Sequence, residues 1–186
     1  MQYIQKKACT RRKQYNHELP RPLGRGYKNT FTNRALAQNL TYNMGYVKIW
    51  VHLVWTTKNR EPLLTHEIRN NIFRHIRENA EKKGIYIDFI NGYTEHIHCL
   101  ISLGCGQSID KIMMLLKGES SFWINKNKIF RKKFEWQDEY FAVSVSESAV
   151  NRVRDYIKTQ EDHHKKKTFN DEYQEFIRKY KFEALI

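Results

Sequence analysis

The chain has 186 residues, enough for one domain with a sizeable core, and its 13% aromatic residues favour a folded protein over a disordered one. A formal net charge of +13 favours a polyanionic partner, nucleic acid first and an acidic membrane surface second. No apolar run approaches the roughly 20 residues of a membrane span, and the first residues lack the apolar stretch of a secretion signal. Three cysteines fit a reducing compartment. We therefore expect a cytoplasmic protein without a membrane partner.

The positive charge is concentrated in residues 1–43, which hold nine Lys or Arg against the single acid Glu18. This segment shows no helical or strand period. Two interpretations stay open for it: a basic, disordered arm that binds nucleic acid, or adventitious upstream sequence before a natural start at Met44. The folded domain is predicted over 44–186, where the net charge is only +5.

Hydrophobic periodicity and turn signals predict an α+β domain. The predicted elements in chain order are a strand over 46–55, a helix over 65–83, strands over 85–90 and 95–103, a helix after Ser108, a strand over 140–145, a helix from Ser146 or Ser148 to about His164, and a short helix within 168–186. This order is that of the ferredoxin-like split βαβ fold. We expect an antiparallel sheet of about four strands with helices on one face and an added C-terminal helical segment. Residues 46–55 and 95–103 would be its central strands.

His96 and His98 stand two residues apart in the predicted strand over 95–103. Alternate residues of a strand point to the same face, so the two imidazoles can hold one cation between them. An isolated His-x-His is more often a pair of half-buried histidines in an ordinary sheet, so further residues must support a site.

The predicted helix before His164 carries Tyr156, Gln160 and His163 at spacings of four and three residues. Residues at these spacings lie along one side of a helix. A lone tyrosine on such a side is usually part of the core. Its combination with His96 and His98 in a basic chain favours a site.

The strand with His96 and His98, followed by a helix with Tyr156-x-x-x-Gln160, resembles the HUH single-tyrosine transposases of small bacterial insertion sequences. The REP-associated tyrosine transposases are their domesticated relatives. The resemblance covers nearly all of 44–186, including the segment His52–Lys58.

The resemblance implies that His96, His98 and Gln160 bind a divalent cation, Mg²⁺ or Mn²⁺, and that Tyr156 is the nucleophile. Nitrogen ligands favour Mn²⁺ where both ions are available. It further implies a single-stranded DNA substrate, a covalent 5′-phosphotyrosine intermediate and imperfect hairpins at the element ends. A homodimer that shares its active sites in trans is also implied.

Other polar residues are assigned accessory roles. We interpret His163 as an accessory ligand, and Glu95 either as a group that supports the histidines or as a solvated residue. The candidates for DNA contacts are basic residues outside these motifs: Lys58, Arg60, Lys117, Arg154 and Lys158.

Three alternatives stay open. A ferredoxin-like module can bind nucleic acid by aromatic stacking without catalysis. A metal-dependent hydrolase would use the same histidines with water as the nucleophile and form no covalent adduct. A domesticated relative would act on chromosomal repeat hairpins instead of its own element.

Overall fold

The computed structural model describes residues 47–165 and 167–182, so the predicted arm over 1–43 lies outside the described residues. Along the described chain the elements are β1 (Ile49–Thr56), the 3-10 helix η1 (Lys58–Arg60), α1 (His66–Lys82), β2 (Tyr86–Gly92), β3 (His96–Leu103), α2 (Ile109–Lys126), β4 (Phe141–Val145), the 3-10 helix η2 (Glu147–Ala149), α3 (Val150–Lys158), α4 (Gln160–His164) and α5 (Phe169–Tyr180).

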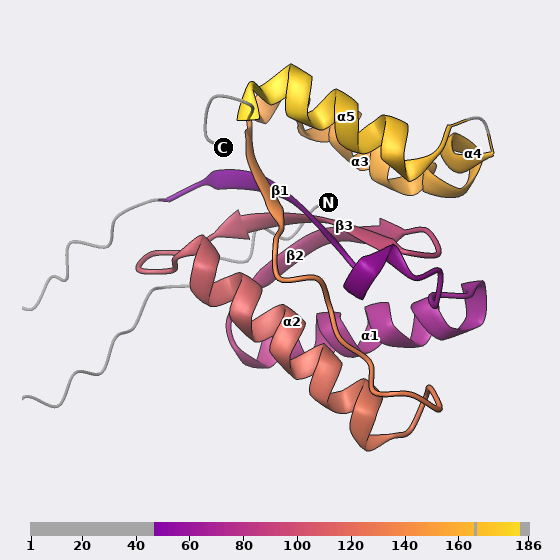
Figure 1. The fold of residues 1–186 in the computed structure, drawn as a ribbon. Helices are drawn as coiled ribbons and strands as arrows, with labels where there is room; N and C mark the ends of the chain where they lie inside the picture. The colour runs from indigo at the N-terminus through magenta and orange to yellow at the C-terminus, as the bar shows by residue number, and fades with distance from the viewer. Residues whose placement is uncertain (1–46, 166, 183–186) are drawn as a thin grey trace, which may run out of the picture. The chain divides into compact units, whose positions relative to one another are not determined.

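The four strands form one antiparallel sheet in the order β2-β3-β1-β4. The predicted ferredoxin-like fold is therefore confirmed, with β1 and β3 at the centre (Figure 1). His98 pairs with Val54 and His96 with Thr56, so each histidine has a defined neighbour on β1.

One face of the sheet carries the main hydrophobic core. Leu53 and Trp55 of β1 and Ile97 and Cys99 of β3 are at most 1% exposed and lie in one cluster with residues of α1 and α2. Because side chains alternate along a strand, the residues between them must face the other way. His96 and His98 therefore point away from this core.

The opposite face is covered by the C-terminal helices, which lie across the sheet from α1 and α2 (Figure 1). Trp50 packs with Val150 and Ile157 of α3, while Val54 packs with Phe169 and Phe176 of α5. The predicted placement of helices on one face therefore applies to α1 and α2. β1 is apolar on both of its faces, so helices must cover both faces of the sheet.

The helix predicted to run to His164 is interrupted at Thr159, which separates α3 from α4. The Thr159 hydroxyl donates to the carbonyl of Asp155, and the side-chain amide of Gln160 donates to the carbonyl of Tyr156. Side chains that bond the backbone four residues earlier bend helices. Tyr156 and Gln160 consequently lie on two different helices.

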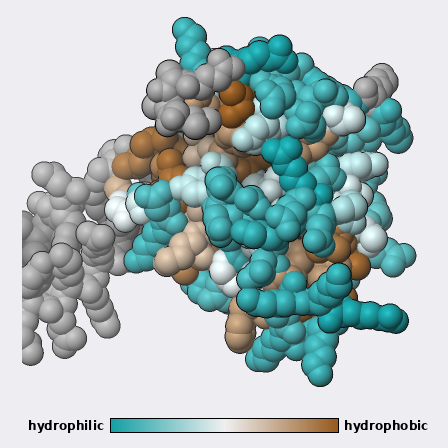
Figure 2. Space-filling model, in the orientation of Figure 1, coloured by the Kyte–Doolittle hydropathy of each residue, from teal (hydrophilic) through white to brown (hydrophobic). Residues whose placement is uncertain are grey.

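The face of the molecule shown in Figure 2 is mainly hydrophilic, with smaller hydrophobic areas. Within the described part of the chain, no helix has the length and apolar character required to cross a membrane.

The turn between β2 and β3 brings two backbones into close approach at Gly92. A Cβ atom there would lie 2.1 Å from the His96 carbonyl oxygen and 2.9 Å from the Ile97 Cα atom. Backbone atoms cannot yield as a flexible side chain can, so this position requires glycine.

We predict that Gly92→Ala lowers the free energy of unfolding by about 1–3 kcal/mol, because the added methyl group displaces the start of β3. Gly118→Ala is the matched control, since a Cβ atom there meets nothing within 4 Å. In the interior of α2 it should stabilise by about 0.5–1 kcal/mol. Urea unfolding of both variants measures the difference, and equal stabilities would contradict the prediction.

Candidate active site

His96 and His98 lie side by side beneath the C-terminal helices. Both residues are 0% exposed, and their ring centroids are 4.9 Å apart. Neighbouring groups orient both rings. His96 Nδ1 lies 3.5 Å from Glu95 Oε1, and His98 Nδ1 lies 3.0 Å from Nε2 of His52 on β1. The Nε2 atom of each ring is thereby directed into the site.

Gln160 brings an amide oxygen to the same place. It is 0% exposed, and its Nε2 group donates to the Tyr156 carbonyl, which turns Oε1 towards His96 Nε2 at 3.3 Å. An ion pair between Arg69 of α1 and Glu161 ties α4, which carries Gln160, to the rest of the domain. The structure thus joins the three predicted ligands, two from β3 and one from α4.

His164, four residues after Gln160, is the second contribution of α4. Its Nδ1 atom lies 3.0 Å from the Lys167 carbonyl oxygen, which can only accept, so Nδ1 carries the hydrogen. In the neutral ring Nε2 then holds an unshared electron pair. This atom lies 3.1 Å from His96 Nε2 and 3.1 Å from Gln160 Oε1.

Glu172 enters the site from the first turns of α5. Its side chain is 3% exposed, and its oxygens lie 3.3 Å from His98 Nε2 and 3.2 Å from His164 Nε2. A capping box between Thr168 and Asp171 fixes the start of α5, and Glu172 follows Asp171 directly. Phe169 stacks on the His96 ring, with centroids 4.3 Å apart, and anchors this first turn over the site.

Burial sets the protonation of these groups. Desolvation, then the charge of His96, lowers the pKa of His98 well below its usual value and lowers that of His164 to about 4. The same desolvation raises the pKa of Glu172 to about 7. His98 and His164 are therefore neutral at neutral pH, the form in which imidazole binds a metal ion.

These donors fit a divalent cation. His98 Nε2 and both Glu172 oxygens are buried without a hydrogen-bond partner, although His98 Nε2 is 3.3 Å from Glu172 Oε1. Buried polar atoms are rarely left unpaired, and buried electron pairs that face one another repel. A cation held by the predicted ligands His96, His98 and Gln160 would remove this conflict.

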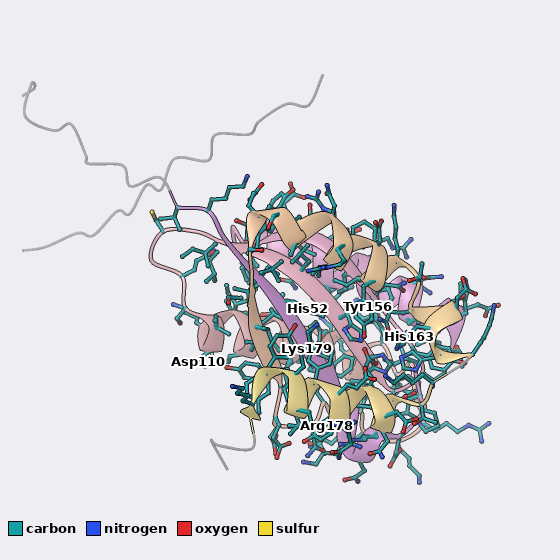
Figure 3. The ribbon with its side chains drawn as sticks, turned by 90° about the horizontal axis from the view of Figure 1, so that it is seen from above. His52, Asp110, Tyr156, His163, Arg178 and Lys179 are labelled. Atoms are coloured by element: carbon teal, nitrogen blue, oxygen red, sulfur yellow. The ribbon has the colours of Figure 1, made fainter. Side chains whose placement is uncertain are left out.

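Tyr156 lies next to these groups within the same chain. Its ring centroid is 5.5 Å from that of His98, at 88°, and 6.2 Å from that of His52. Figure 3 shows Tyr156, His52 and His163 between α3 and α5. The position of α3 is held by Asn91 of β2, whose amide donates to the carbonyls of Ile157 and Lys158.

The two predicted accessory residues occupy different places. Glu95 lies beside His96, as expected for a supporting group. His163 stacks edge-on against Tyr156, with centroids 5.5 Å apart, while its neighbour His164 makes the contacts with His96 and Gln160. His163 is thus beside the predicted nucleophile, and His164 is beside the predicted ligands.

The basic candidates for DNA contacts fall into two groups, near the two edge strands. Before β4, Asp138 accepts from Lys58 through its carboxylate and from Lys117 through its carbonyl. Near β2, Arg154 forms two hydrogen bonds with Asp88, and Lys158 lies over the Phe89 ring. Lys58, Lys117 and Arg154 therefore also hold parts of the protein together.

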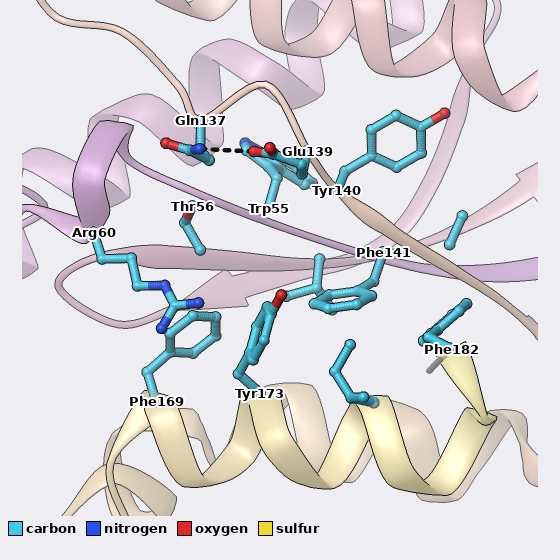
Figure 4. A pocket seen from close by; sticks show the side chains of 13 residues that line it. Trp55, Thr56, Arg60, Gln137, Glu139, Tyr140, Phe141, Phe169, Tyr173 and Phe182 are labelled. Carbon is cyan, nitrogen blue, oxygen red and sulfur yellow. Dashed lines mark hydrogen bonds between the residues drawn. The ribbon is translucent and has the colours of Figure 1, made fainter. Parts of the chain in front are cut away.

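Arg60, the fifth candidate, borders a cavity of about 570 Å³ between β4 and α5. Its guanidinium group lies 4.4 Å from the Tyr173 ring centroid and 5.5 Å from that of Phe169 (Figure 4). Tyr140 and Phe141 add further aromatic surface. Phe169 is shared between this cavity and the His96 ring, so the two sites are neighbours.

Sequence reasoning missed His52, His164 and Glu172. Glu172 had a usable signal, since it falls among Phe169, Tyr173 and Phe176 on the apolar side of α5, where a carboxylate is unusual. His164 also had a usable signal, because it lies four residues after Gln160 on the same side of the predicted helix. His52 had no local signal, because its contact with His98 depends on the register between β1 and β3.

Comparison with known proteins adds independent observations. A family model described as "Transposase IS200 like" matches residues 45–160. The chain is 27% identical over 125 residues to the ISDra2 transposase TnpA of Deinococcus radiodurans, a match that covers 63% of this chain and 89% of that protein.

Two solved structures share the fold. A crystal structure at 1.90 Å, assigned as a transposase of Deinococcus radiodurans R1, has a TM-score of 0.51 and 24% identity and covers 62% of this chain and 94% of that one. A REP-associated tyrosine transposase bound to a REP hairpin has a TM-score of 0.51 and 17% identity, with 66% of this chain and 73% of that one covered.

We predict that His96→Ala and His98→Ala each weaken Mn²⁺ binding by about tenfold or more, because even groups that only support metal ligands contribute 10–100-fold. Isothermal titration calorimetry measures the affinity. The control is His75→Phe on α1, which keeps the ring stacked on Trp123 at the other face of the sheet. Wild-type affinity in either site variant would refute the assignment of these ligands.

Proposed function

Because the chain belongs to the IS200-like transposase family, and is therefore a DNA-cleaving enzyme of transposition, we propose that it cleaves and rejoins single-stranded DNA through a covalent 5′-phosphotyrosine on Tyr156. The observation that carries this proposal is the position of Tyr156 beside the buried donors His96, His98 and Gln160. A binding module without catalysis would need no such arrangement.

The reaction exchanges one phosphoester bond for another. The Tyr156 hydroxyl oxygen forms a bond to phosphorus and loses its proton, while the bond from phosphorus to the 3′ oxygen breaks and that oxygen gains a proton. The 5′-phosphotyrosine retains the energy of the phosphodiester. A 3′ hydroxyl of another strand can then reverse the step, so rejoining needs no ATP.

The chain's own residues prepare this step. His52 fixes the orientation of His98, Glu95 lies against His96, and Gln160 is held by the Tyr156 carbonyl. A divalent cation bound by His96, His98 and Gln160, Mn²⁺ or Mg²⁺, supplies positive charge that neutralises the phosphate and orients the scissile bond.

We further propose that the substrate carries an imperfect hairpin near the cleavage site. The REP-associated tyrosine transposase with the same fold is bound to a REP hairpin. Basic residues near both edge strands, among them Lys58 and Lys158, are available for contacts with DNA phosphates. Whether the hairpins border the enzyme's own element or are chromosomal repeats depends on the flanking DNA.

We predict that Tyr156→Phe abolishes cleavage while folding and hairpin binding persist, because the change removes a single oxygen. End-labelled single-stranded DNA incubated with wild-type protein and Mn²⁺ should give a covalent adduct that survives heat and detergent. Tyr173→Phe on α5 is the matched control. A nick with free ends and no adduct in the wild type would instead support a hydrolase that uses water.

The resemblance predicts a homodimer whose sites are shared in trans, whereas Tyr156 here contacts histidines of its own chain. This contact supports an active site completed within one chain. We expect that a mixture of His96→Ala/His98→Ala protein with Tyr156→Phe protein stays inactive. Recovery of cleavage after subunit exchange, with the adduct on the histidine variant, would establish the trans arrangement.

A further inference from the structure

Two residues outside the predicted ligand set, His164 and Glu172, have donor atoms directed at the same point as that set. We propose that both are ligands of the divalent cation, so that the C-terminal helices α4 and α5 complete the metal site. This inference rests on the proposed function for the cation itself, and it adds the ligands that determine how tightly and how selectively the cation is bound.

The separations between donor atoms support this assignment. His164 Nε2 lies 3.1 Å from His96 Nε2, 3.1 Å from Gln160 Oε1 and 3.2 Å from Glu172 Oε2. Neighbouring donors around an octahedral cation, each about 2.1 Å from it, are separated by about 3 Å. His96, His164 and Glu172 together offer three ligand atoms within 4.8 Å of one another.

A hydrogen bond cannot account for the 3.1 Å between His164 Nε2 and Gln160 Oε1. The His164 hydrogen is on Nδ1, where the Lys167 carbonyl accepts it. Nε2 of His164 and Oε1 of Gln160 are then both acceptors. Acceptors at such distances, buried from water, repel unless a positive charge lies between them.

Glu172 has the clearest need for a cation. Its side chain is 3% exposed, and neither oxygen has a hydrogen-bond partner. Among the described residues, the nitrogen atoms that lie within 4.0 Å of this carboxylate belong to His96, His98 and His164, and it forms no ion pair with Lys or Arg. A buried carboxylate without a partner is strongly unfavourable, whereas a carboxylate bound to a metal ion is not.

The proposed five ligands determine which metal ion the site prefers. Three imidazoles with one amide oxygen and one carboxylate form a nitrogen-rich site, which favours Mn²⁺ over Mg²⁺. The carboxylate adds a negative charge that neutral ligands lack. Loss of Glu172 should therefore reduce affinity at least as much as loss of a histidine.

The test is a Mn²⁺ titration of the full-length protein by calorimetry. Glu172→Gln keeps the shape of the side chain and removes the charge, and we expect affinity to fall by about tenfold or more. His164→Gln should weaken binding similarly. Glu175→Gln on the same helix is the control, because that carboxylate is 59% exposed and pairs with Lys167, and its affinity should stay within about twofold of the wild type.

Thermal unfolding separates a ligand from a structural residue. At about pH 8, above the pKa of Glu172, a ligand role predicts that metal-free Glu172→Gln melts at or above the wild-type temperature, because a buried unpaired charge has been removed. It also predicts that Mn²⁺ raises the melting temperature of the variant less than that of the wild type. A lower melting temperature without metal, together with an unchanged rise on adding Mn²⁺, would overturn the proposal.

Failure of this inference differs from failure of the proposed function. Wild-type Mn²⁺ affinity in both Glu172→Gln and His164→Gln, with weakened binding in His98→Ala, removes only the added ligands. Absence of a Tyr156 adduct in the wild-type protein removes the proposed reaction and leaves the metal affinities as measured.

Discussion

Electrostatic repulsion among buried electron-pair donors opposes the assembly of this site, and the surrounding elements must overcome it. His96, Gln160, His164 and Glu172 hold nitrogen or oxygen atoms close together away from water, and His98 Nε2 lies 3.3 Å from Glu172. Such a cluster opposes folding unless something positive occupies it. The surrounding fold must therefore be stable enough to hold these groups together before a cation compensates them.

The sheet provides that stability through its other face. Leu53, Trp55, Ile97 and Cys99 pack against α1 and α2, while the residues between them carry the chemistry. The strict alternation of a strand separates the two roles residue by residue. Substitutions in the core therefore act on the site mainly through the position of β1 and β3.

The helices α3 and α4 position different residues of the site. α3 is fixed to β2 through Asn91 and through the ion pair of Arg154 with Asp88, so Tyr156 has a defined position over His98. The interruption at Thr159 then turns the chain so that Gln160 and His164 face His96.

Local sequence patterns determined much of this protein. Strand alternation was enough to place His96 and His98 on one face, and the element order was enough for the ferredoxin-like topology with β1 and β3 at its centre. Both patterns are local or follow from chain order, so they can be recognised without knowledge of packing. Tyr156 and Gln160 were singled out because their motif, together with His96 and His98, resembles that of the transposase family.

Which distant residues lie beside His96, His98 and Gln160 depends on tertiary packing. His52 meets His98 through the register of two strands, and Glu172 reaches the site because α5 packs on Val54 and stacks Phe169 on His96. The break at Thr159 also depends on side-chain bonds to the backbone, which periodicity does not detect. The contacts of His52 and Glu172 with His98 join residues more than 40 positions apart in the chain, and packing free energy, not local conformational preference, selects them.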